Sequence, residues 1–533
     1  MRGSFNPMLV SVCVSAVVGL TNCGGGASPD ALPTIVAEAP PPGAPPPSNA
    51  PPPANTPPPP DGSDGAGNAP AGVAPPPSSC TLLPPLPVRP SRVRNVKDFG
   101  ATADDLTDDT AAIQRAINAL SPGEWLVFPK GRYLHNTSIR VKTPNVVLWS
   151  EGATLHATNA SNQAMWLEAD GVSIYNFTLT AVTENRRTTP WESRIAVFGG
   201  SNPRRLLKNN VVRGNRVIWS GPAGSALANS ASSAGIFVYH ATNFLVAENQ
   251  VSRSLADGIH VTAGSSNGKV LKNTVTETGD DMIAVVSYIG MDASTPASKV
   301  AAEYESRKAG NLNRGILIAH NTVSGQYWGR GITVVGGDGV RIENNSISKT
   351  THAAGVYLAR EVSYLTFGVR NVLVRNNTIR DVQTTAPDYI TGKPATSFTR
   401  TRHGGVEIYS HLFADEAAIG WLRDALAVEN IVVENNIIDG TIADGVRVGN
   451  GYERTWSYGG RPVTGGSVGL ISLTGNKLSR IGTQGISILN RPTLNYNVLC
   501  ESNTKDGSAT AHNMCSGPKF KLPAVSVPVL CAS

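Results

Sequence analysis

The N-terminal part of the sequence lacks aromatic residues, since no Phe, Trp or Tyr occurs between Cys23 and Phe99. The same stretch holds 23 of the 38 prolines, all between Pro29 and Pro90. A segment without large apolar side chains cannot build a hydrophobic core. Residues 23–90 are therefore predicted to form an extended, semi-rigid tether of polyproline type.

The sequence also lacks a P-loop, a dinucleotide-binding Gly motif and zinc-ligand spacing, which argues against the enzymes that depend on them. From Arg89 onward it has 44 Lys and Arg residues against 35 Asp and Glu residues. This mild basic excess suits an acidic glycan, although it also fits anionic surfaces or basic residues scattered over a solvated face. No nucleic-acid partner is expected.

The longest apolar run, Met8 to Leu20, has 13 residues, too few to cross a bilayer. With Arg2 before it, it predicts a signal peptide over residues 1–22. The ending Leu-Thr-Asn-Cys, followed by three glycines, resembles a bacterial lipoprotein processing site and implies lipidation of Cys23. An ordinary cleaved signal peptide is the alternative. Both predict export, either to the outer membrane or cell surface through a lipid anchor, or to the periplasm or extracellular space.

Four cysteines remain once Cys13 is removed and Cys23 is used for lipidation. An even number in an oxidising compartment favours two disulfides. The arrangement we favour pairs Cys500 with Cys515 and Cys80 with Cys531. Residues 491–533 would then form a C-terminal cap.

A short pattern recurs along the rest of the chain: apolar-x-apolar-x-Asn-x-apolar, a polar turn, then Gly-apolar-x-apolar. The spacing is 24 residues from Asn249 to Asn273, 48 from there to Asn321, and 24 more to Asn345. Short alternating strands joined by Asn- and Gly-bearing turns at fixed spacing are typical of a β-solenoid. We therefore predict stacked coils of about 24 residues, with the Asn side chains forming a ladder inside one turn.

An amphipathic helix is predicted before the first coils, because apolar residues recur at helical spacing from Ala111 to Leu120 after a cap at Thr107 or Asp108. It would cover the open end of the solenoid. The segment VKDFGATADDLTDDTAAIQRAINAL, with VFPKGRYLHNTSI after it, resembles the opening of the pectate-lyase-like β-helix superfamily. That resemblance covers about residues 91–490 and implies an all-β fold, a right-handed parallel β-helix with an N-terminal capping helix.

Three acidic residues are expected to meet on the outer surface. Asp257 lies eight residues after Asn249, and Asp281 eight after Asn273, so both share one register on successive coils, with Asp280 beside them. Like charges this close raise one another's pKa, so the cluster must share a proton, bind a cation or pair with Arg or Lys. The alternative is a turn role, because Asp444 stands in ADGVRV, a near copy of ADGIHV around Asp257.

The motifs LADGIHV and TGDDMIAV resemble those of the polygalacturonase-like glycoside hydrolases. The resemblance implies hydrolysis with inversion, Asp280 as general acid, Asp257 and Asp281 as base, and no cofactor. Where that family has Gly-His-Gly, this sequence has Gly-Arg-Gly around Arg330; where it has Arg-x-Lys, this sequence has Tyr-Leu-Ala followed by Arg360. These departures argue against polygalacturonic acid itself as the substrate.

Two other functions remain open. A lyase or epimerase could use the Asp cluster to hold Ca²⁺ against a uronate carboxylate, with Arg330 or Arg360 as the base. The same arginines could instead bind a substrate carboxylate or pair with the aspartates. A noncatalytic surface glycan-binding protein is the third possibility.

Further substrate-binding residues are predicted near the cluster. His260 follows Asp257-Gly258 and could face the substrate, as could His352 and His403. Three insertions, near residues 287–313, 381–403 and 411–430, are predicted to be loops that wall a groove. Possible sugar platforms are Tyr288, Tyr327, Trp328, Tyr357 and Trp421. Together these features predict an exported enzyme that cleaves a polysaccharide, with an acidic glycan as the expected substrate.

Overall fold

The computed structural model describes residues 83–183, 186, 189, 192–200, 202, 205–219, 230–385, 400–449, 456–489, 497–511 and 522. The predicted signal peptide, Cys23, Cys80, Cys515 and Cys531 lie outside these residues. Cys500 is disulfide-bonded. None of the helices in the described ranges combines the length and the apolar character that a bilayer crossing requires. The solenoid belongs to one compact unit that includes residues 87–528.

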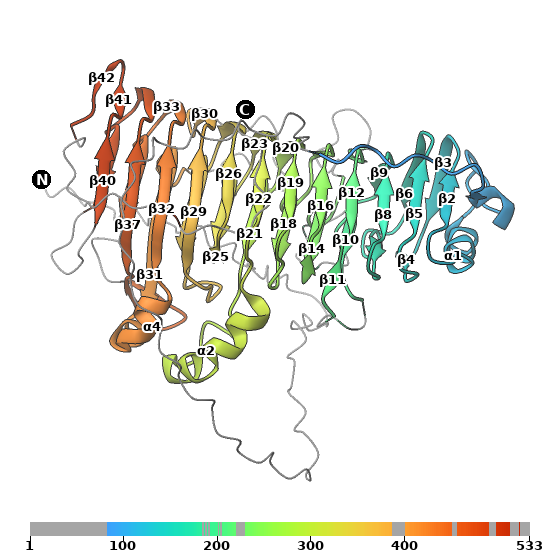
Figure 1. The fold of residues 1–533 in the computed structure, drawn as a ribbon, viewed down its shortest axis with the longest axis horizontal. Helices are drawn as coiled ribbons and strands as arrows, with labels where there is room; N and C mark the ends of the chain where they lie inside the picture. The colour runs from blue at the N-terminus through green and yellow to red at the C-terminus, as the bar shows by residue number, and fades with distance from the viewer. Residues whose placement is uncertain are drawn as a thin grey trace, which may run out of the picture. The chain divides into compact units, whose positions relative to one another are not determined.

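Short strands stack into a right-handed parallel β-helix, as the sequence predicted (Figure 1). A regular coil contributes one strand to each of three sheets, and neighbouring coils pair in parallel. The first sheet contains β1 (Arg94–Asn95), β2 (Trp125–Phe128), β5 (Val147–Ser150), β8 (Ser173–Tyr175), β12 (Val211–Arg213), β16 (Leu245–Ala247), β19 (Lys269–Leu271), β22 (Leu317–Ala319), β26 (Arg341–Glu343), β29 (Val369–Arg375), β32 (Val428–Glu434), β37 (Val468–Thr474) and β40 (Val498–Glu501), with β25 (Gly337–Asp338) beside β29.

The second sheet follows the first after a two-residue bend in most coils. It contains β3 (Gly131–His135), β6 (Ala153–Ala157), β9 (Thr178–Ala181), β13 (Arg216–Val217), β17 (Gln250–Ser252), β20 (Thr274–Thr278), β23 (Thr322–Gln326), β27 (Ser346–Thr350), β30 (Thr378–Val382), β33 (Ile437–Thr441), β38 (Lys477–Ile481), β41 (Thr504–Lys505) and β42 (Ser508–Ala509).

The third sheet follows the turns that hold Asp257, Asp280 and Asp281. It contains β4 (Ile139–Val141), β7 (Met165–Leu167), β10 (Ile195–Val197), β14 (Ile236–Tyr239), β18 (Ile259–Thr262), β21 (Ile283–Val286), β24 (Ile332–Val335), β28 (Val356–Arg360), β31 (Val406–Phe413), β34 (Val446–Gly449) and β39 (Ile486–Ile488). An antiparallel pair, β35 (Trp456–Tyr458) and β36 (Arg461–Gly465), extends the end of β31. A small separate pair is formed by β11 (Leu207–Lys208) and β15 (Ala241–Thr242).

A ladder of buried Asn side chains fixes the bend between the first and second sheets. The backbone N–H and the Nδ2 atom of Asn249 both donate to Oδ1 of Asn273, each at 3.0 Å. Residues just before ladder members, such as Glu248 (φ 56°) and Lys272 (φ 53°), are left-handed, which turns the chain sharply. The predicted ladder is therefore confirmed. Its members are Asn215, Asn249, Asn273, Asn321, Asn345, Asn377, Asn436, Asn476 and Asn503.

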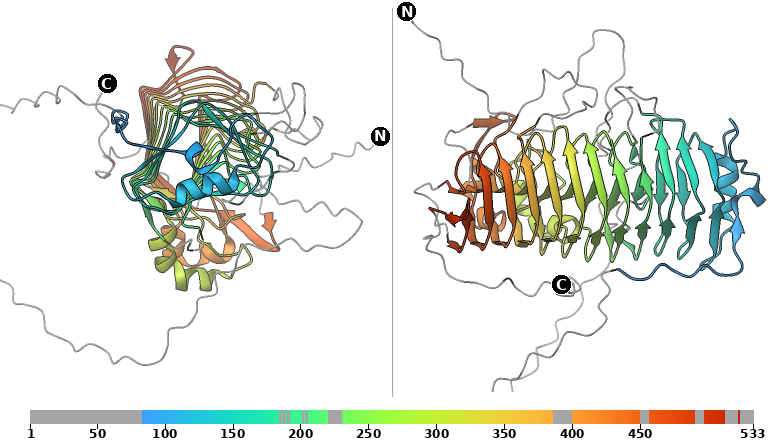
Figure 2. Two further views of the ribbon diagram at one scale, coloured as in Figure 1. Left: turned by 90° about the vertical axis from the view of Figure 1, so that its right-hand side faces the viewer. Right: turned by 90° about the horizontal axis from the view of Figure 1, so that it is seen from above.

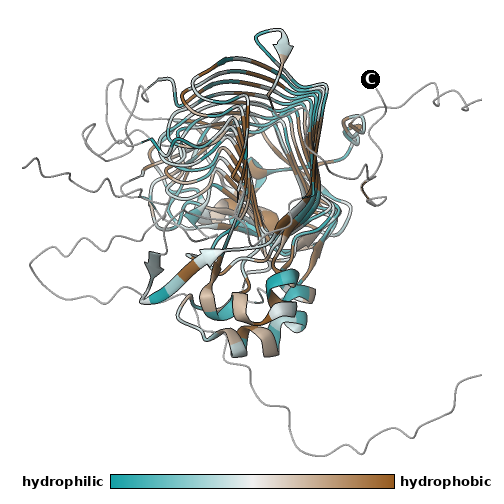
Figure 3. Ribbon diagram, turned by 90° about the vertical axis from the view of Figure 1, so that its left-hand side faces the viewer, coloured by the Kyte–Doolittle hydropathy of each residue, from teal (hydrophilic) through white to brown (hydrophobic). Residues whose placement is uncertain are grey.

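The hydrophobic core fills the inside of the coils. Ile259 and Val261 of β18 are fully buried and pair with Ile283 and Val285 one coil further on. Full burial of one such side chain contributes roughly 1.5–3 kcal/mol. Figure 3 shows apolar residues along the strands of successive coils, viewed along the stack. The intervening residues of these strands face outward.

The helix α1 (Thr110–Asn118) covers one end of the stack, as predicted (Figure 2). Its buried face includes Ile113 and Ile117. It follows the short 3-10 helix η1 (Val96–Phe99). The residue at the N-cap is Asp109 and not Thr107 or Asp108, but its side chain makes no capping hydrogen bond and accepts instead from the backbone N–H groups of Thr102 and Leu134. The Oδ1 atom of Asp108 accepts from the backbone N–H of Thr110, the first residue of the helix, at 3.1 Å.

The solenoid extends past residue 490, where the sequence predicted a separate cap to begin. The strand β40 pairs in parallel with β37, and β41 pairs with β38. Asn503 adds a further step to the ladder, because its Oδ1 atom accepts from Asn476. The repeated pattern is broken there, because Lys505 stands two residues after Asn503, at the position that holds the apolar Leu478 one coil earlier.

Two of the predicted loops contain helices. The insertion after β21 holds α2 (Ala297–Asn311), and the insertion after β31 holds α3 (Ala414–Ala418) and α4 (Gly420–Ala425). They share a second apolar core that includes Val300, Phe413 and Leu422. The hydroxyl of Tyr304 in α2 donates to the carbonyl of Ala425 at 2.9 Å. Residues 386–399 of the remaining insertion lie outside the described ranges.

Candidate functional site

The aspartates stand where the polar turn enters the third sheet. Ile259 of β18 pairs with Ile283 of β21, and Asp257 and Asp281 each lie two residues earlier in the chain. The backbone N–H of Gly258 donates to the carbonyl of Asp281 at 2.9 Å, so the two turns are themselves paired. Equal coil length thus gives Asp257 and Asp281 the same register, which agrees with the prediction.

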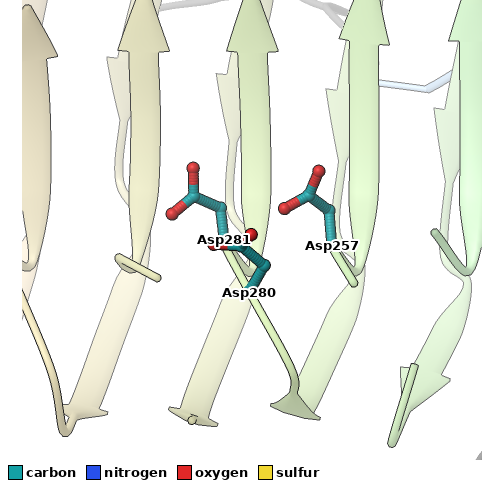
Figure 4. A group of neighbouring side chains, drawn as sticks. All are labelled: Asp257, Asp280 and Asp281. Atoms are coloured by element: carbon teal, nitrogen blue, oxygen red, sulfur yellow. The ribbon is translucent and has the colours of Figure 1, made fainter. Parts of the chain in front are cut away.

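The three carboxyl groups converge. One oxygen each from Asp257, Asp280 and Asp281 lies within 4.8 Å of the others. Figure 4 shows Asp257 on one coil and the other two on the adjacent coil. Their side chains are 15%, 9% and 7% exposed respectively, so the cluster is more enclosed than a surface patch.

Each carboxylate has a nitrogen partner. His260 Nδ1 lies 2.5 Å from Asp257 Oδ2. The guanidinium of Arg186 forms an ion pair with Asp280. The backbone N–H of Arg330 donates to Asp281 Oδ1 at 2.6 Å, and its guanidinium lies 3.7 Å from Oδ2. Of the alternatives that the sequence left open, the structure shows pairing with Arg for Asp280 and Asp281.

Burial raises the pKa of Asp281 well above its ordinary value. The guanidinium of Arg330 acts in the opposite direction, whereas Asp280 and Asp257 raise that pKa further. A carboxyl group in this environment keeps its proton at a higher pH than a solvated one. The site is thus able to hold a proton among its three carboxyl groups.

A second layer of side chains surrounds Arg330. Its guanidinium forms an ion pair with Glu361, and its Cζ atom lies 4.4 Å from the ring centroid of Tyr357. Tyr357 in turn stacks on His403, with ring centroids 5.4 Å apart. These contacts place Arg330 and Tyr357 beside the cluster, where both are buried, and their role in substrate binding stays a prediction.

Arg360 does not face the cluster, so its prediction as a substrate-binding residue or base is corrected. It is fully buried, and its guanidinium donates to Glu416 of α3 at 2.8 Å and to the carbonyl of His411 at 2.7 Å. Period-2 alternation puts Arg360 on the same side of β28 as Leu358, opposite to Tyr357. Its role is to anchor the helical insertion.

The remaining aromatic residues that were predicted as sugar platforms differ in their exposure to solvent. Trp328 stacks on His352 with ring centroids 4.4 Å apart and is partly exposed. Tyr327 is almost fully buried. Trp421 is 52% exposed and packs against Tyr304 of α2.

The turn interpretation of an Asp before Gly applies to Asp444. Its Oδ1 atom accepts from the hydroxyl of Thr483 and from the backbone N–H of Gln484. Asp281 makes the same backbone contact with Arg330, which occupies the matching position one coil on. Asp281 therefore also supports the turn.

Sequence reasoning missed Arg186, Glu361 and Tyr364, and identified Tyr288 only as a possible platform. Burial raises the pKa of Tyr288 well above its ordinary value, and Tyr364, Asp257, Asp280 and Glu361 raise it further. The rings of Tyr288 and Tyr364 lie 5.9 Å apart. These residues lie outside the repeated motif, because Tyr288 comes from the insertion after β21, Arg186 from the connection between β9 and β10, and Glu361 and Tyr364 from the connection between β28 and β29.

The chain matches the family model described as rhamnogalacturonase A/epimerase, pectate lyase-like, over residues 93–386, more than half of its length. It therefore belongs to that family. No curated protein matches it.

Several solved structures have a similar fold. The catalytic domain of a GH87 α-1,3-glucanase in complex with tetrasaccharides gives a TM-score of 0.55 at 16% identity, with 79% of this chain and 71% of that chain covered. The same type of domain in complex with nigerose gives 0.51 at 16% identity and the same coverage. The A-module of a mannuronan C-5 epimerase from Azotobacter vinelandii gives 0.45 at 17% identity, covering 77% and 99%. At these identities the likeness concerns the fold.

Proposed function

We propose that the protein is an enzyme that hydrolyses glycosidic bonds in a polysaccharide, with Asp257, Asp280 and Asp281 as its catalytic residues. The observation that carries this proposal is the convergence of three carboxyl groups within 4.8 Å, one of them with a strongly raised pKa. Glycoside hydrolysis needs one carboxyl group that keeps a proton and another that is ionised. Membership of a family described by carbohydrate-active enzymes supports the same reaction class.

In the proposed mechanism Asp280 is the general acid and passes a proton to the glycosidic oxygen, while its buried neighbour Asp281, whose pKa is raised, keeps a proton in the cluster. Asp257, whose carboxylate is oriented by His260, takes a proton from water. The water oxygen bonds to the anomeric carbon as the glycosidic bond breaks. Arg330 holds Asp281 in place through its backbone and its guanidinium. An acidic glycan is the proposed substrate class, on the basis of the excess of basic residues from Arg89 onward.

A Ca²⁺-dependent lyase or epimerase acting on a uronate polymer is the second candidate. Three carboxylate oxygens within 4.8 Å are ligands of the type that Ca²⁺ prefers. Arg186 and Arg330 already pair with two of the three, so a cation would compete with them. In this reaction Arg330 would be the base, and Arg360 would take no part because it is fully buried.

A panel of polygalacturonate, alginate and α-1,3-glucan, with product masses as the readout, tests the function. Hydrolysis adds one water to each pair of products, whereas elimination adds none and gives unsaturated, light-absorbing uronate ends. We expect hydrolysis that persists in the presence of a chelator. Unsaturated products lost on chelation would favour the lyase, and an unchanged mass with an altered ratio of uronate epimers in the polymer would favour the epimerase. Binding to a polymer without any product would favour a noncatalytic glycan-binding protein.

We also propose that the protein is exported and anchored through a lipid on Cys23. The support is the apolar run that ends in Leu-Thr-Asn-Cys, followed by the proline-rich tether. With Cys23→Ser, we expect the protein to leave the membrane fraction, while the wild type starts at Cys23 and carries the mass of a lipid. Cys13→Ser is the matched control and should not change the fractionation. A wild-type protein that starts elsewhere without a lipid would support ordinary secretion.

A further inference from the structure

On the N-terminal side of the acidic cluster, the side chains on the outer face of the third sheet are almost inaccessible to solvent. His260 of β18 and Phe237 of β14 point outward, yet they are only 6% and 7% exposed. Their rings stack with centroids 4.8 Å apart and an interplanar angle of 10°. Tyr239 stacks beside Phe237, and Phe198 packs edge-on against Tyr239. A ligand therefore has little access to the outer face of the coils just before the cluster.

On the C-terminal side of the acidic cluster, the side chains on the outer face of the third sheet are also almost inaccessible to solvent. Thr333, Tyr357 and Glu407 occupy successive outward positions and are 0%, 3% and 1% exposed. Arg330 lies against Tyr357, and Arg447 Nε donates to both carboxylate oxygens of Glu407 at 2.8 and 2.9 Å. A ligand lying here would have to displace an ion pair and stacked rings.

The outward side chains further along the same strands are also buried. Thr262 and Val286 lie at the outward positions of β18 and β21 beyond His260 and Ala284, and they are 2% and 8% exposed. Solvent reaches the cluster instead at Asp257, whose side chain is 15% exposed, and at Arg186, whose side chain is 33% exposed. The carboxyl groups are thus approached from the side of the turns that precede the third sheet.

This one-sided access determines how a long chain could reach the carboxyl groups. Cleavage within a polymer requires sugars to be bound on both sides of the broken bond. The neighbouring coil lies about 4.8 Å away, so sugars flanking the bond would meet the covered positions on either side. A chain end needs space in one direction only. We propose that the enzyme releases short products from the end of a polysaccharide chain; this rests on the proposed hydrolase function.

The test compares two preparations of the polymer from the panel that is cleaved, at equal mass and with mean chain lengths that differ about tenfold. Below KM, the rate of an end-acting enzyme follows the concentration of ends, so the shorter preparation should react about tenfold faster. The first products should be mono- or disaccharides, and the viscosity of the long preparation should fall slowly. Equal rates per mass, a mixture of long oligomers at early times and a rapid fall in viscosity would overturn the inference while leaving the hydrolase proposal intact. Failure to cleave any polymer would overturn both.

A variant that removes a large side chain on the N-terminal side of the acidic cluster gives a second, independent readout. Phe237→Ala removes the ring that stacks on His260 and should lengthen the first products released from the long preparation. Trp149→Ala is the matched control, because Trp149 stacks between Trp125 and Tyr175 on the first sheet. Its products should match those of the wild type. Unchanged product lengths in Phe237→Ala would contradict the assignment of that side as the barrier.

Discussion

Replacing Asp280 with Asn is expected to lower kcat by about 10³-fold, because an amide cannot deliver a proton to the glycosidic oxygen. KM should change by less than about threefold, since the side chain keeps its size and its amide oxygen can still accept from Arg186, although the ion pair is lost. The measurement is steady-state kinetics on the polymer that the wild type cleaves. Far-UV circular dichroism and thermal unfolding should show that the fold is retained.

Asp444→Asn is the matched control for this experiment. Asp444 has the same position in its coil as Asp257 and Asp281, but its carboxylate bonds only to Thr483 and Gln484 among the described contacts. We expect kcat within about twofold of the wild type, since the residue acts on the turn. Similar kcat losses in Asp444→Asn and Asp280→Asn would mean that the cluster is structural, and an active Asp280→Asn would rule out its role as the acid.

Asn321→Ala should lower the free energy of unfolding by about 4 kcal/mol, because several buried polar groups lose their partners at once. The backbone N–H and Nδ2 of Asn273 donate to Asn321 Oδ1 at 2.9 and 3.0 Å. On its other side, Asn321 Nδ2 donates to Val270 O and Asn345 Oδ1. Denaturation by urea, followed by tryptophan fluorescence, gives the difference in stability.

Asn118→Ala is the control for the ladder experiment, because Asn118 is exposed at the end of α1. Its effect should stay within about 0.5 kcal/mol. A loss below about 1 kcal/mol in Asn321→Ala would show that water or a local shift replaces the ladder contacts.

The part of the site that could be predicted from sequence depends on the repeat. Asn249 and Asn273 are 24 residues apart, and the hydrogen bond between their side chains makes that spacing a geometric constraint. Anything at a fixed distance from a ladder Asn therefore has a fixed place in the coil. Asp257 and Asp281 could be aligned for this reason without knowledge of the sheets.

The residues that sequence reasoning missed have no such constraint. Arg186 reaches the cluster from the connection between β9 and β10, and Glu361 directly follows β28, so neither residue stands in the repeated motif that aligns the aspartates. The prediction for Arg360 was wrong for a different reason. Arg360 follows Tyr-Leu-Ala, and it was predicted to replace, one residue further along the chain, a residue of the Arg-x-Lys motif. One residue of offset in a strand exchanges outside for inside, and Arg360 is fully buried with Glu416.

The coil arrangement has a consequence for how such a protein can change over generations. The proposed catalytic groups come from two adjacent turns, β17 to β18 and β20 to β21, and from no others. Whole repeats can thus be gained or lost outside the coils that carry these aspartates and their partners Arg186 and Arg330, which alters the length of the rod while the proposed chemistry is inherited intact. A coil without an equivalent aspartate, inserted between the turn of Asp257 and the turn of Asp280, would instead separate Asp257 from its two companions by one full step and end the proposed reaction.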